Sequence, residues 1–397
     1  MQILRGQSKI SNIGSTQEIL TNVMSTVSPA ASFYMPLKRS MQRSIRKLRQ
    51  KESDSYEPIP LVLKDLIIPE KYKFTKKGDL FLIKDTGADD PCIKNRIILY
   101  GTNENIKTLS RCDEYFMDGT FKSCPKIFSQ LYIIHGLYEG VPMPLVYALL
   151  CSKTSEIYKK MFELLNEIYP LNPQKIHIDF EMAMIKTLTN IFKGAQVICC
   201  FFHLQKSIYH HLGVIGSKIK YDTDVNFAFE VRTLISIAFV PIEHQERYYE
   251  ILMEKNLLND DDDLINYFES NYFGLLRPNG LRRKPRFPRE LWNFHEEARN
   301  SGHKTNNIAE GFNNALNHLI NISGPNIWQL LQVLQKKQGE MEFGRDQVRN
   351  QREMGVPQKK KYKDLSEHIS RVANNFNNYD PFDYMKAIAA ITRIDYT

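Results

Sequence analysis

The sequence predicts an α/β fold in which a mixed sheet is combined with an all-helical insertion and a helical C-terminal region. Apolar runs rich in β-branched and aromatic residues, typical of strands, occur between residues 60 and 203 and do not return afterwards. From residue 155 onward these runs alternate with stretches whose apolar residues recur at helical spacing. Beyond residue 203 the pattern is helical. These observations predict a sheet-containing core followed by helices.

The bulk properties agree with an intracellular globular protein. The chain has 397 residues, 42% of them hydrophobic, which is enough for a large core and excludes a disordered protein. It contains no run of about 18 or more apolar residues and no apolar segment behind the first charges, so neither a membrane span nor a secretory signal is predicted. The six cysteines form no Cys-x-x-Cys pair, which favours reduced thiols. The net charge of +8 permits a polyanionic partner.

The N-terminal part is predicted to precede the core. Residues 1–55 are expected to form a basic flexible arm, and residues 56–110 a small lead-in module of short apolar runs. The arm ends in "LKRSMQRSIRKLRQK", which is either a solvated basic helix or a nucleic-acid contact. The candidate DNA-binding residues in it are Lys38, Arg39, Arg43, Arg46 and Lys47.

Residues 111–206 are predicted to form the first part of the core. "EYFMDGTF", "FSQLYIIHGLYEG" and "VPMPLVYALLC" are successive strand-like runs joined by short Gly or Pro breaks, as in adjacent antiparallel strands. The helix "SEIYKKMFELLNEIY", the strand "KIHIDF", the helix "EMAMIKTLTNIFKG" and the strand "QVICCFF" follow. Three strands, a crossing helix and then parallel strands is the order of a ribonuclease-H-like core, in which the first and fourth strands are neighbours.

The second half of the chain is predicted to be helical. Residues 207–300 form a helical insertion, residues 301–345 complete the core with helices, and residues 346–397 form a C-terminal helical tail. The insertion closes with a basic segment, "RRKPRFPR", which either holds DNA or is a solvated loop. Its candidate DNA-binding residues are Arg282, Arg283, Lys284, Arg286 and Arg289.

Two aspartates lie at strand ends that the predicted topology makes neighbours. Asp118 sits in "MDGTF", where Asp-Gly between apolar residues is also the strongest short-range hairpin signal. Asp179 follows the fourth strand and is also a plausible helix N-cap. Since their strands are adjacent, both carboxylates could converge on divalent cations held about 3.5–4 Å apart.

A third carboxylate, Glu310, lies on a predicted helix. A helix glutamate is usually a solvated surface charge. Here the helix carries a predicted apolar stripe, and Glu310 is one turn from the polar pair Asn313 and Asn314 rather than in a surface pattern of alternating charges. The stripe consists of Ile308, Phe312, Ala315 and Leu319. We therefore expect Glu310 to face a specific partner.

Four segments in this order, "MDGTFK", "HIDFEMAM", "CCFFHLQKSI" and "TNNIAEGFNNALN", resemble the transposase domain of Mutator-like DNA transposons, over roughly residues 90–345. The resemblance implies an Asp-Asp-Glu enzyme with Asp118, Asp179 and Glu310 as catalytic residues that hold two divalent cations, Mg²⁺ or Mn²⁺. It implies cut-and-paste cleavage and strand transfer at transposon ends, with DNA as the partner. A homodimer or higher oligomer on DNA and a location in the nucleus are expected.

The family's Cys-x-x-His element corresponds to Cys200 and His203. A structural zinc site needs four ligands, and nearby in the sequence only Cys199, His210 and His211 could join, two of them a turn or more along the next helix. A buried core cysteine with a satisfied histidine is the simpler alternative. We favour a His203 at the mouth of the active site that orients a carboxylate or contacts the scissile strand.

The N-terminal part of the sequence differs from that of many relatives, because it shows no Cys/His zinc finger. Recognition of the transposon ends would then fall to the basic arm and the lead-in module, or to residues that are not part of this sequence. One alternative function is a domesticated, non-cutting DNA-binding protein or transcriptional regulator. Another is a metal-dependent nuclease that does not transpose, because a shared fold does not separate the two activities. The presence of all three acids favours an enzyme.

Overall fold

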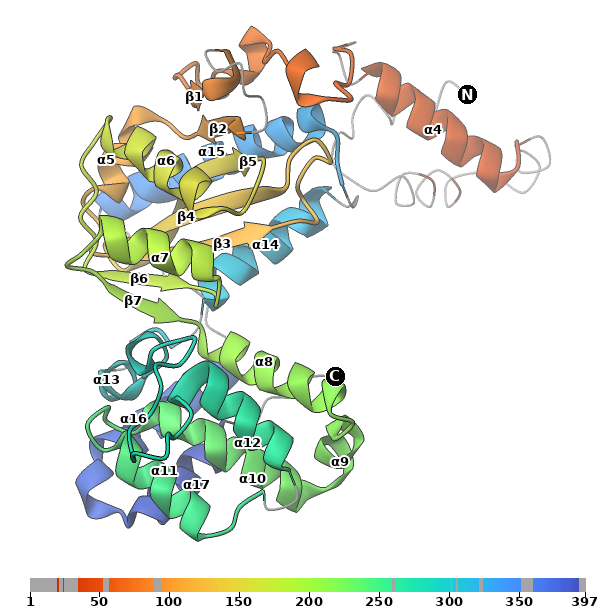
Figure 1. Cartoon of the computed structure of the whole chain (residues 1–397). Coiled ribbons are helices and arrows are strands. Elements are labelled where there is room, and N and C mark those ends of the chain that lie inside the picture. The colour runs from red at the N-terminus through yellow and green to blue at the C-terminus, as the bar shows by residue number, and fades with distance from the viewer. Residues whose placement is uncertain are drawn as a thin grey trace. The chain divides into compact units, whose positions relative to one another are not determined.

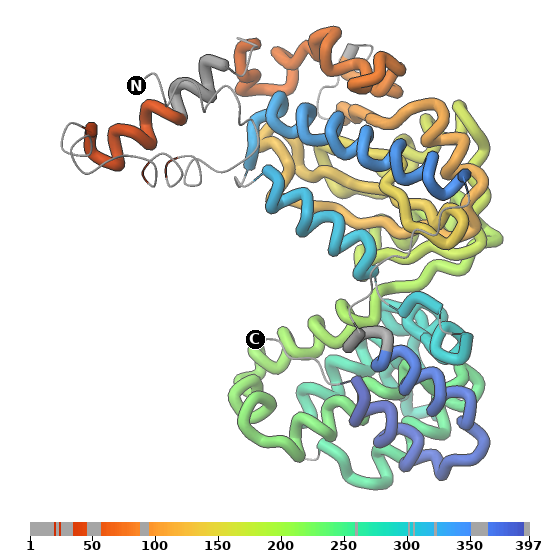
Figure 2. Tube along the Cα trace, turned by 180° about the vertical axis from the view of Figure 1, so that it is seen from behind, coloured from red at the N-terminus to blue at the C-terminus, as the bar shows by residue number. Residues whose placement is uncertain are grey.

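The computed structural model describes most of the chain (Figures 1 and 2). The described residues are 20, 24, 35–52, 57–88, 95–258, 261–300, 302–304, 306–320, 324–350 and 360–392. The chain divides into two compact units, Met1–Pro60 and Leu61–Thr397, and each is described by itself.

The first unit contains helix α4, Lys38–Glu52, which has one apolar side. Met41 and Ile45 on that side are buried together with Leu20. The candidate DNA-binding residues Lys38, Arg39 and Arg43 are exposed, while the side chains of Arg46 and Lys47 lie outside the described part. The predicted basic segment is thus an amphipathic helix that presents cations to solvent.

The second unit is built on a seven-stranded mixed sheet with the order β1-β2-β5-β4-β3-β6-β7. Its strands are β1 (Leu82–Asp85), β2 (Ile97–Tyr100), β3 (Glu114–Thr120), β4 (Gln130–Tyr138), β5 (Val141–Leu150), β6 (Lys175–Ile178) and β7 (Gln196–Cys199). Strands β3 and β6 pair in parallel, as do β6 and β7, and the other pairs are antiparallel. The predicted adjacency of the first and fourth core strands is confirmed, because these are β3 and β6.

The region predicted as a separate lead-in module instead contributes two strands to this sheet. All four residues of β2 are buried, and they pair with residues Tyr147 to Leu150 of β5. Strand β1 then pairs with β2 at the sheet edge. A fully apolar strand is stabilised when both of its faces are buried. Strand β2 reaches this state by pairing with β5 of the core sheet.

The hairpin interpretation of "MDGTF" is wrong. Asp118 and Gly119 lie inside β3, opposite Ile133 and Tyr132 of β4. The tight turn of the sheet is formed instead by Glu139 and Gly140 between β4 and β5, with φ of 48° and 74°. Two consecutive left-handed residues are the signature of a type I′ hairpin turn.

Helices cover both faces of the sheet, as the two views in Figures 1 and 2 show. Alternate strand residues point to opposite faces, so Ile97 and Leu99 belong to one apolar cluster and Ile98 and Tyr100 to the other. The first cluster includes residues of α5 (Asn103–Leu109), α6 (Ser155–Asn166) and α7 (Met182–Ile191). The second includes residues of α14 (Asn307–Ile320) and α15 (Ile327–Arg349).

The buried stripe of α14 differs from the predicted one. Two residues of the predicted stripe, Ala315 and Leu319, are exposed. The buried residues of α14 are Ala309, Asn313, Leu316 and Ile320. The predicted stripe lies one residue too early because hydrophobicity alone does not put an asparagine on a buried face. Asn313 is buried because its side chain has a specific partner there.

The remaining helices form a region that packs onto the core. They are α8 (Phe201–Val214), α9 (Lys218–Thr223), α10 (Val225–Ile235), α11 (Gln245–Glu254), α12 (Asp262–Phe268), α13 (His295–Arg299), α16 (Lys360–Asn374) and α17 (Pro381–Ile391). Strand β7 ends at Cys199, so the last residues of the predicted strand "QVICCFF" begin α8 instead.

The predicted C-terminal tail completes this helical region. Tyr384 and Ile388 of α17 are fully buried in the same apolar cluster as α10, and the Tyr384 hydroxyl donates to the carbonyl of Phe239 at 2.7 Å. Among the described residues, no helix combines the length and the apolar character that a membrane span requires.

Candidate functional site

The predicted acids come from three elements of the second unit. Asp118 lies in β3, and Asp179 follows the end of β6, the parallel neighbour of β3. Glu310 lies in the first turn of α14. Because parallel neighbours end at the same edge of a sheet, the two aspartates approach each other there.

Asn306 positions the start of α14 beside this edge. Its side chain is fully buried, and its Nδ2 donates to the carbonyl of Met117 at 2.8 Å. Its backbone N–H donates to Sγ of Cys200 at 3.2 Å. One residue therefore ties α14 to β3 and to the beginning of α8, which brings Glu310 to the site. Sequence reasoning missed Asn306, although it lies in "TNNIAEGF", within the last of the four family-like segments.

Asp118 is held by α14 from one side. Nδ2 of Asn313 donates to Asp118 Oδ2 at 2.7 Å, which is the partner that explains the buried position of Asn313. Asp118 and Asp179 line the same cavity of about 80 Å³. Burial and then the negative charge of Asp179 raise the pKa of Asp118 to about 7, with a smaller contribution from Glu310. The site thus holds more negative charge than its own groups neutralise.

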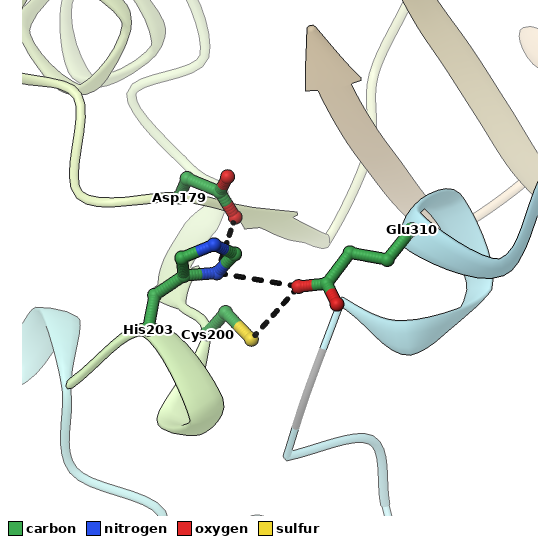
Figure 3. Close-up of side chains that lie close together, drawn as sticks. All are labelled: Asp179, Cys200, His203 and Glu310. Carbon is green, nitrogen blue, oxygen red and sulfur yellow. Dashed lines mark hydrogen bonds and ion pairs between the residues drawn. The ribbon is translucent and has the colours of Figure 1, made fainter. Parts of the chain in front are cut away.

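The other two acids meet at His203 (Figure 3). Nδ1 of His203 lies 3.0 Å from Asp179 Oδ1 and 3.3 Å from Glu310 Oε1. Neither oxygen lies in the direction of the ring N–H, so Nδ1 and Asp179 Oδ1 remain buried without a hydrogen bond. These contacts are ion pairs by distance, and the three side chains face a common point.

The charges in this group depend on one another. Burial lowers the pKa of His203, but Asp179 and the Cys200 sulfur outweigh it and raise that pKa to about 10. Burial raises the pKa of Glu310, and the nearby His203 partly offsets the rise. The imidazolium therefore compensates part of the negative charge of the two carboxylates.

Cys200 completes the group. It is buried, and its sulfur lies 4.0 Å from Glu310 Oε1. Asp179, Cys200, His203 and Glu310 each offer one ligand atom, and these four atoms all lie within 4.8 Å of one another. This group, found among the described residues, leaves out Asp118. His203 lies beside two of the carboxylates, and its predicted role in orienting one of them or contacting the scissile strand stays a prediction.

A chain of hydrogen bonds that sequence reasoning missed lies next to the cavity. Nε2 of Gln130 donates to the Tyr158 hydroxyl, which donates to Oε1 of Glu181, each at 2.6 Å. Gln130 and Glu181 both line the cavity with Asp118. Glu181 could have been suspected from the sequence, because it follows Asp179 by only two residues. Gln130 belongs to a different strand, β4, and no sequence feature pointed to it.

The basic segment 282–289 is only partly available for DNA. Arg282 is 14% exposed, and its Nη1 lies 2.7 Å from Oε1 of Glu269. Arg282 and Arg289 also pair with Glu246. These ion pairs compensate the charge of both arginines within the insertion. The DNA-binding role of Arg282 and Arg289 stays a prediction.

The other cations of the segment, Arg283, Lys284 and Arg286, are exposed. The segment is anchored beside Asp179 through buried Phe287, whose ring lies 5.0 Å from that of Phe180 in an edge-to-face contact. These three residues are therefore the cations of this segment that remain accessible.

The comparison with known proteins agrees with this architecture. A family model described as the MULE transposase domain matches residues 115–207. The match starts in β3 and ends in α8, so it covers Asp118, Asp179, Cys200 and His203 and stops before Glu310. No curated protein and no solved structure matches the chain. The seven-stranded mixed sheet followed by a largely helical region is consistent with a ribonuclease-H-like transposase fold. Residues 115–207 therefore form a segment that the family model identifies as a MULE transposase domain.

Proposed function

We propose that this protein is a cut-and-paste DNA transposase that catalyses metal-dependent strand cleavage and strand transfer at transposon ends. The observation that carries the proposal is the convergence of three acids that lie far apart in the sequence. Asp118 and Asp179 line one cavity, and Asp179 and Glu310 lie 3.0 Å and 3.3 Å from the same atom, Nδ1 of His203. The charge of Asp179 raises the pKa of both Asp118 and Glu310, after burial as the larger cause. Acids that repel one another in a folded protein are the usual mark of a cation site.

The chemistry of the donors fits divalent cations. Asp118, Asp179 and Glu310 offer carboxylate oxygens, and Oδ1 of Asp179 is buried without a hydrogen bond. Oxygen ligands suit Mg²⁺ or Mn²⁺. When bound, two such cations would activate a water or a 3′-hydroxyl and stabilise the leaving oxygen.

The chain's own residues orient the carboxylates. Asn313 fixes one oxygen of Asp118, which leaves the other oxygen for a ligand. His203 lies between Asp179 and Glu310 and limits the rotation of both side chains. The three acids are therefore held in place before a substrate arrives, as a catalytic site requires.

The proposed partner is DNA, bound as the two transposon ends by a homodimer or higher oligomer in the nucleus. Exposed Arg283, Lys284 and Arg286 lie on the segment anchored beside Asp179, and they would contact phosphates near the acids. The exposed cations of α4 would add contacts from the first unit.

The substitution Asp118→Asn tests this proposal. An amide keeps the shape and the contact with Asn313 but is a poor ligand for a cation, so Mg²⁺-dependent nicking of transposon-end DNA should fall by orders of magnitude. Asp179→Asn and Glu310→Gln should have the same effect. Exposed Asp113, immediately before β3, provides a matched control, and Asp113→Asn should cleave normally.

DNA affinity separates this enzyme from a non-cutting DNA-binding protein. Binding depends on Lys and Arg contacts to phosphates, so the three variants should bind DNA about as tightly as the unmodified protein, with the same salt dependence. Cleavage retained by Asp118→Asn would refute the assignment of the acids. An unmodified protein that binds DNA and never cuts it would favour the domesticated regulator.

A further inference from the structure

We propose that Asp179, Cys200, His203 and Glu310 bind one zinc ion in the DNA-free protein. Occupation of this site would withdraw Asp179 and Glu310 from the magnesium ions that cleavage requires. The second statement rests on the proposed function, whereas the zinc site stands on the four side chains alone. Zinc bound at this site would therefore inhibit DNA cleavage.

The spacing of the four donor atoms is close to that around a zinc ion. A tetrahedral zinc ion with bonds of about 2.0–2.3 Å holds its ligand atoms about 3.3–3.7 Å apart. The corresponding contacts of His203 Nδ1 are 3.0 Å to Asp179 and 3.3 Å to Glu310, and Cys200 Sγ is 4.0 Å from Glu310. The largest separation within the group is below 4.8 Å. Small rotations of these side chains would close them around an ion.

Two of the donor atoms lack hydrogen-bond partners. Asp179 Oδ1 and His203 Nδ1 are buried and make no hydrogen bond, although they are only 3.0 Å apart. A histidine that merely positions a carboxylate would align its N–H with the oxygen. In Figure 3 the two carboxylates approach the imidazole from different sides, with the Cys200 sulfur next to Glu310. All four groups face one point, as ligands do.

The Cys200 sulfur is enclosed beside the start of α14. Cys200 is 2% exposed, and its Sγ accepts a hydrogen bond from the backbone N–H of Asn306 at 3.2 Å. The Cys200 thiol in turn donates to Glu310 Oε1 at 4.0 Å, so the sulfur faces another donor of the group. Zinc binding would displace the thiol proton of Cys200 and the Nδ1 proton of His203 into solvent.

The donor set selects the metal. A thiolate and an imidazole favour zinc, whereas magnesium takes oxygen ligands in octahedral geometry. Asp118 lies outside the group of four and has one oxygen held by Asn313. A zinc ion would thus use two of the three acids and leave Asp118 unused, while the proposed magnesium pair needs all three.

The test uses the full chain, freed of metal with a chelator and titrated with zinc alone. Competition with a chromophoric chelator should show one zinc per chain. Cobalt(II) should bind in its place with an absorption band that arises from charge transfer from a cysteine thiolate. This band is read from the unmodified protein, so it does not depend on whether a variant folds.

The variants locate the ligands. Cys200→Ser should weaken zinc binding by about 100-fold or more, since even the loss of outer partners costs about 10–100-fold, and should abolish the cobalt band. Cys199→Ser, the same change one residue earlier, should keep both. Asp118→Asn should leave zinc affinity within a few-fold, because Asp118 is not in the group.

The outcomes separate this inference from the proposed function. No stoichiometric zinc, or a cobalt complex without the thiolate band, would overturn the zinc site even if magnesium-dependent cleavage is observed. Zinc binding with the expected variant pattern would support the site even if the protein never cuts DNA. Where cleavage is observed, zinc that binds without inhibiting it would refute the sharing of Asp179 and Glu310.

Discussion

Replacing Gly119 by alanine should destabilise the protein through a clash inside the sheet, although the residue lies in ordinary strand conformation. A Cβ atom at Gly119 would lie 2.5 Å from Oε1 of Gln130 and 3.2 Å from Cδ2 of Tyr132. Gln130 is fully buried, and its Nε2 donates to the Tyr158 hydroxyl at 2.6 Å. The amide cannot move away without breaking this bond. Gly119 is thus required by the close approach of Gln130.

The magnitude follows from three contributions. Overpacking a buried site costs about 1–3 kcal/mol. Loss of the hydrogen bond between Gln130 and Tyr158 adds about 1 kcal/mol. Alanine recovers about 0.5–1 kcal/mol, because it loses less chain entropy than glycine in a strand. The free energy of unfolding should therefore fall by about 1–3 kcal/mol.

Urea unfolding followed by circular dichroism measures this change, and a second background identifies its cause. In a Gln130→Ala protein the alanine at position 119 should cost less than about 0.5 kcal/mol, since its clashing partner is gone. Gly140→Ala is the control. Its φ is +74° and a Cβ there would meet no atom within 4 Å, so its cost of about 1–2 kcal/mol is backbone strain and should not depend on Gln130. An equal cost of Gly119→Ala in both backgrounds would refute the reasoning.

Three further predictions concern the cations and the assembly. Arg282→Leu should lower the free energy of unfolding by about 2–3 kcal/mol, because Glu269 loses its partner, while DNA affinity in fluorescence anisotropy stays unchanged. Arg283→Ala combined with Lys284→Ala should weaken binding to all DNA sequences alike. The slope of log affinity against log salt concentration should become shallower by about one unit for each phosphate that is no longer neutralised. An unchanged slope would exclude a role of these cations in DNA binding. Mass photometry with paired transposon ends should show dimers or higher oligomers on DNA, and monomers on every bound DNA would contradict the assembly.

The sequence by itself determined the order of the core elements and the approach of two acids. The period of the apolar residues identified β3 to β7 with the helices between them, because burial on one side of a strand or helix leaves a local pattern. The order of these elements then made β3 and β6 neighbours, and Asp118 and Asp179 line one cavity as a consequence.

Only the tertiary structure decided which distant groups meet these acids. Asp-Gly at 118–119 has the local signature of a turn, but it is held in β3 by pairing with β4, and the glycine is needed for a side chain of that strand. Asn313 was excluded from the predicted stripe by its polarity, yet it is buried because Asp118 accepts its hydrogen bond. In both cases a long-range partner outweighs the local preference.

The same reason explains the group around His203. The sequence near Cys200 contains too few zinc ligands, because two of the donors lie after β6 and in α14 rather than in the next helix. The ion pair between Arg282 and Glu269 was not predicted for the same reason, since Glu269 lies in a different part of the insertion. Local periodicity records which face of an element is buried. Which atoms pack against that face depends on the tertiary fold. A local sequence pattern does not identify them.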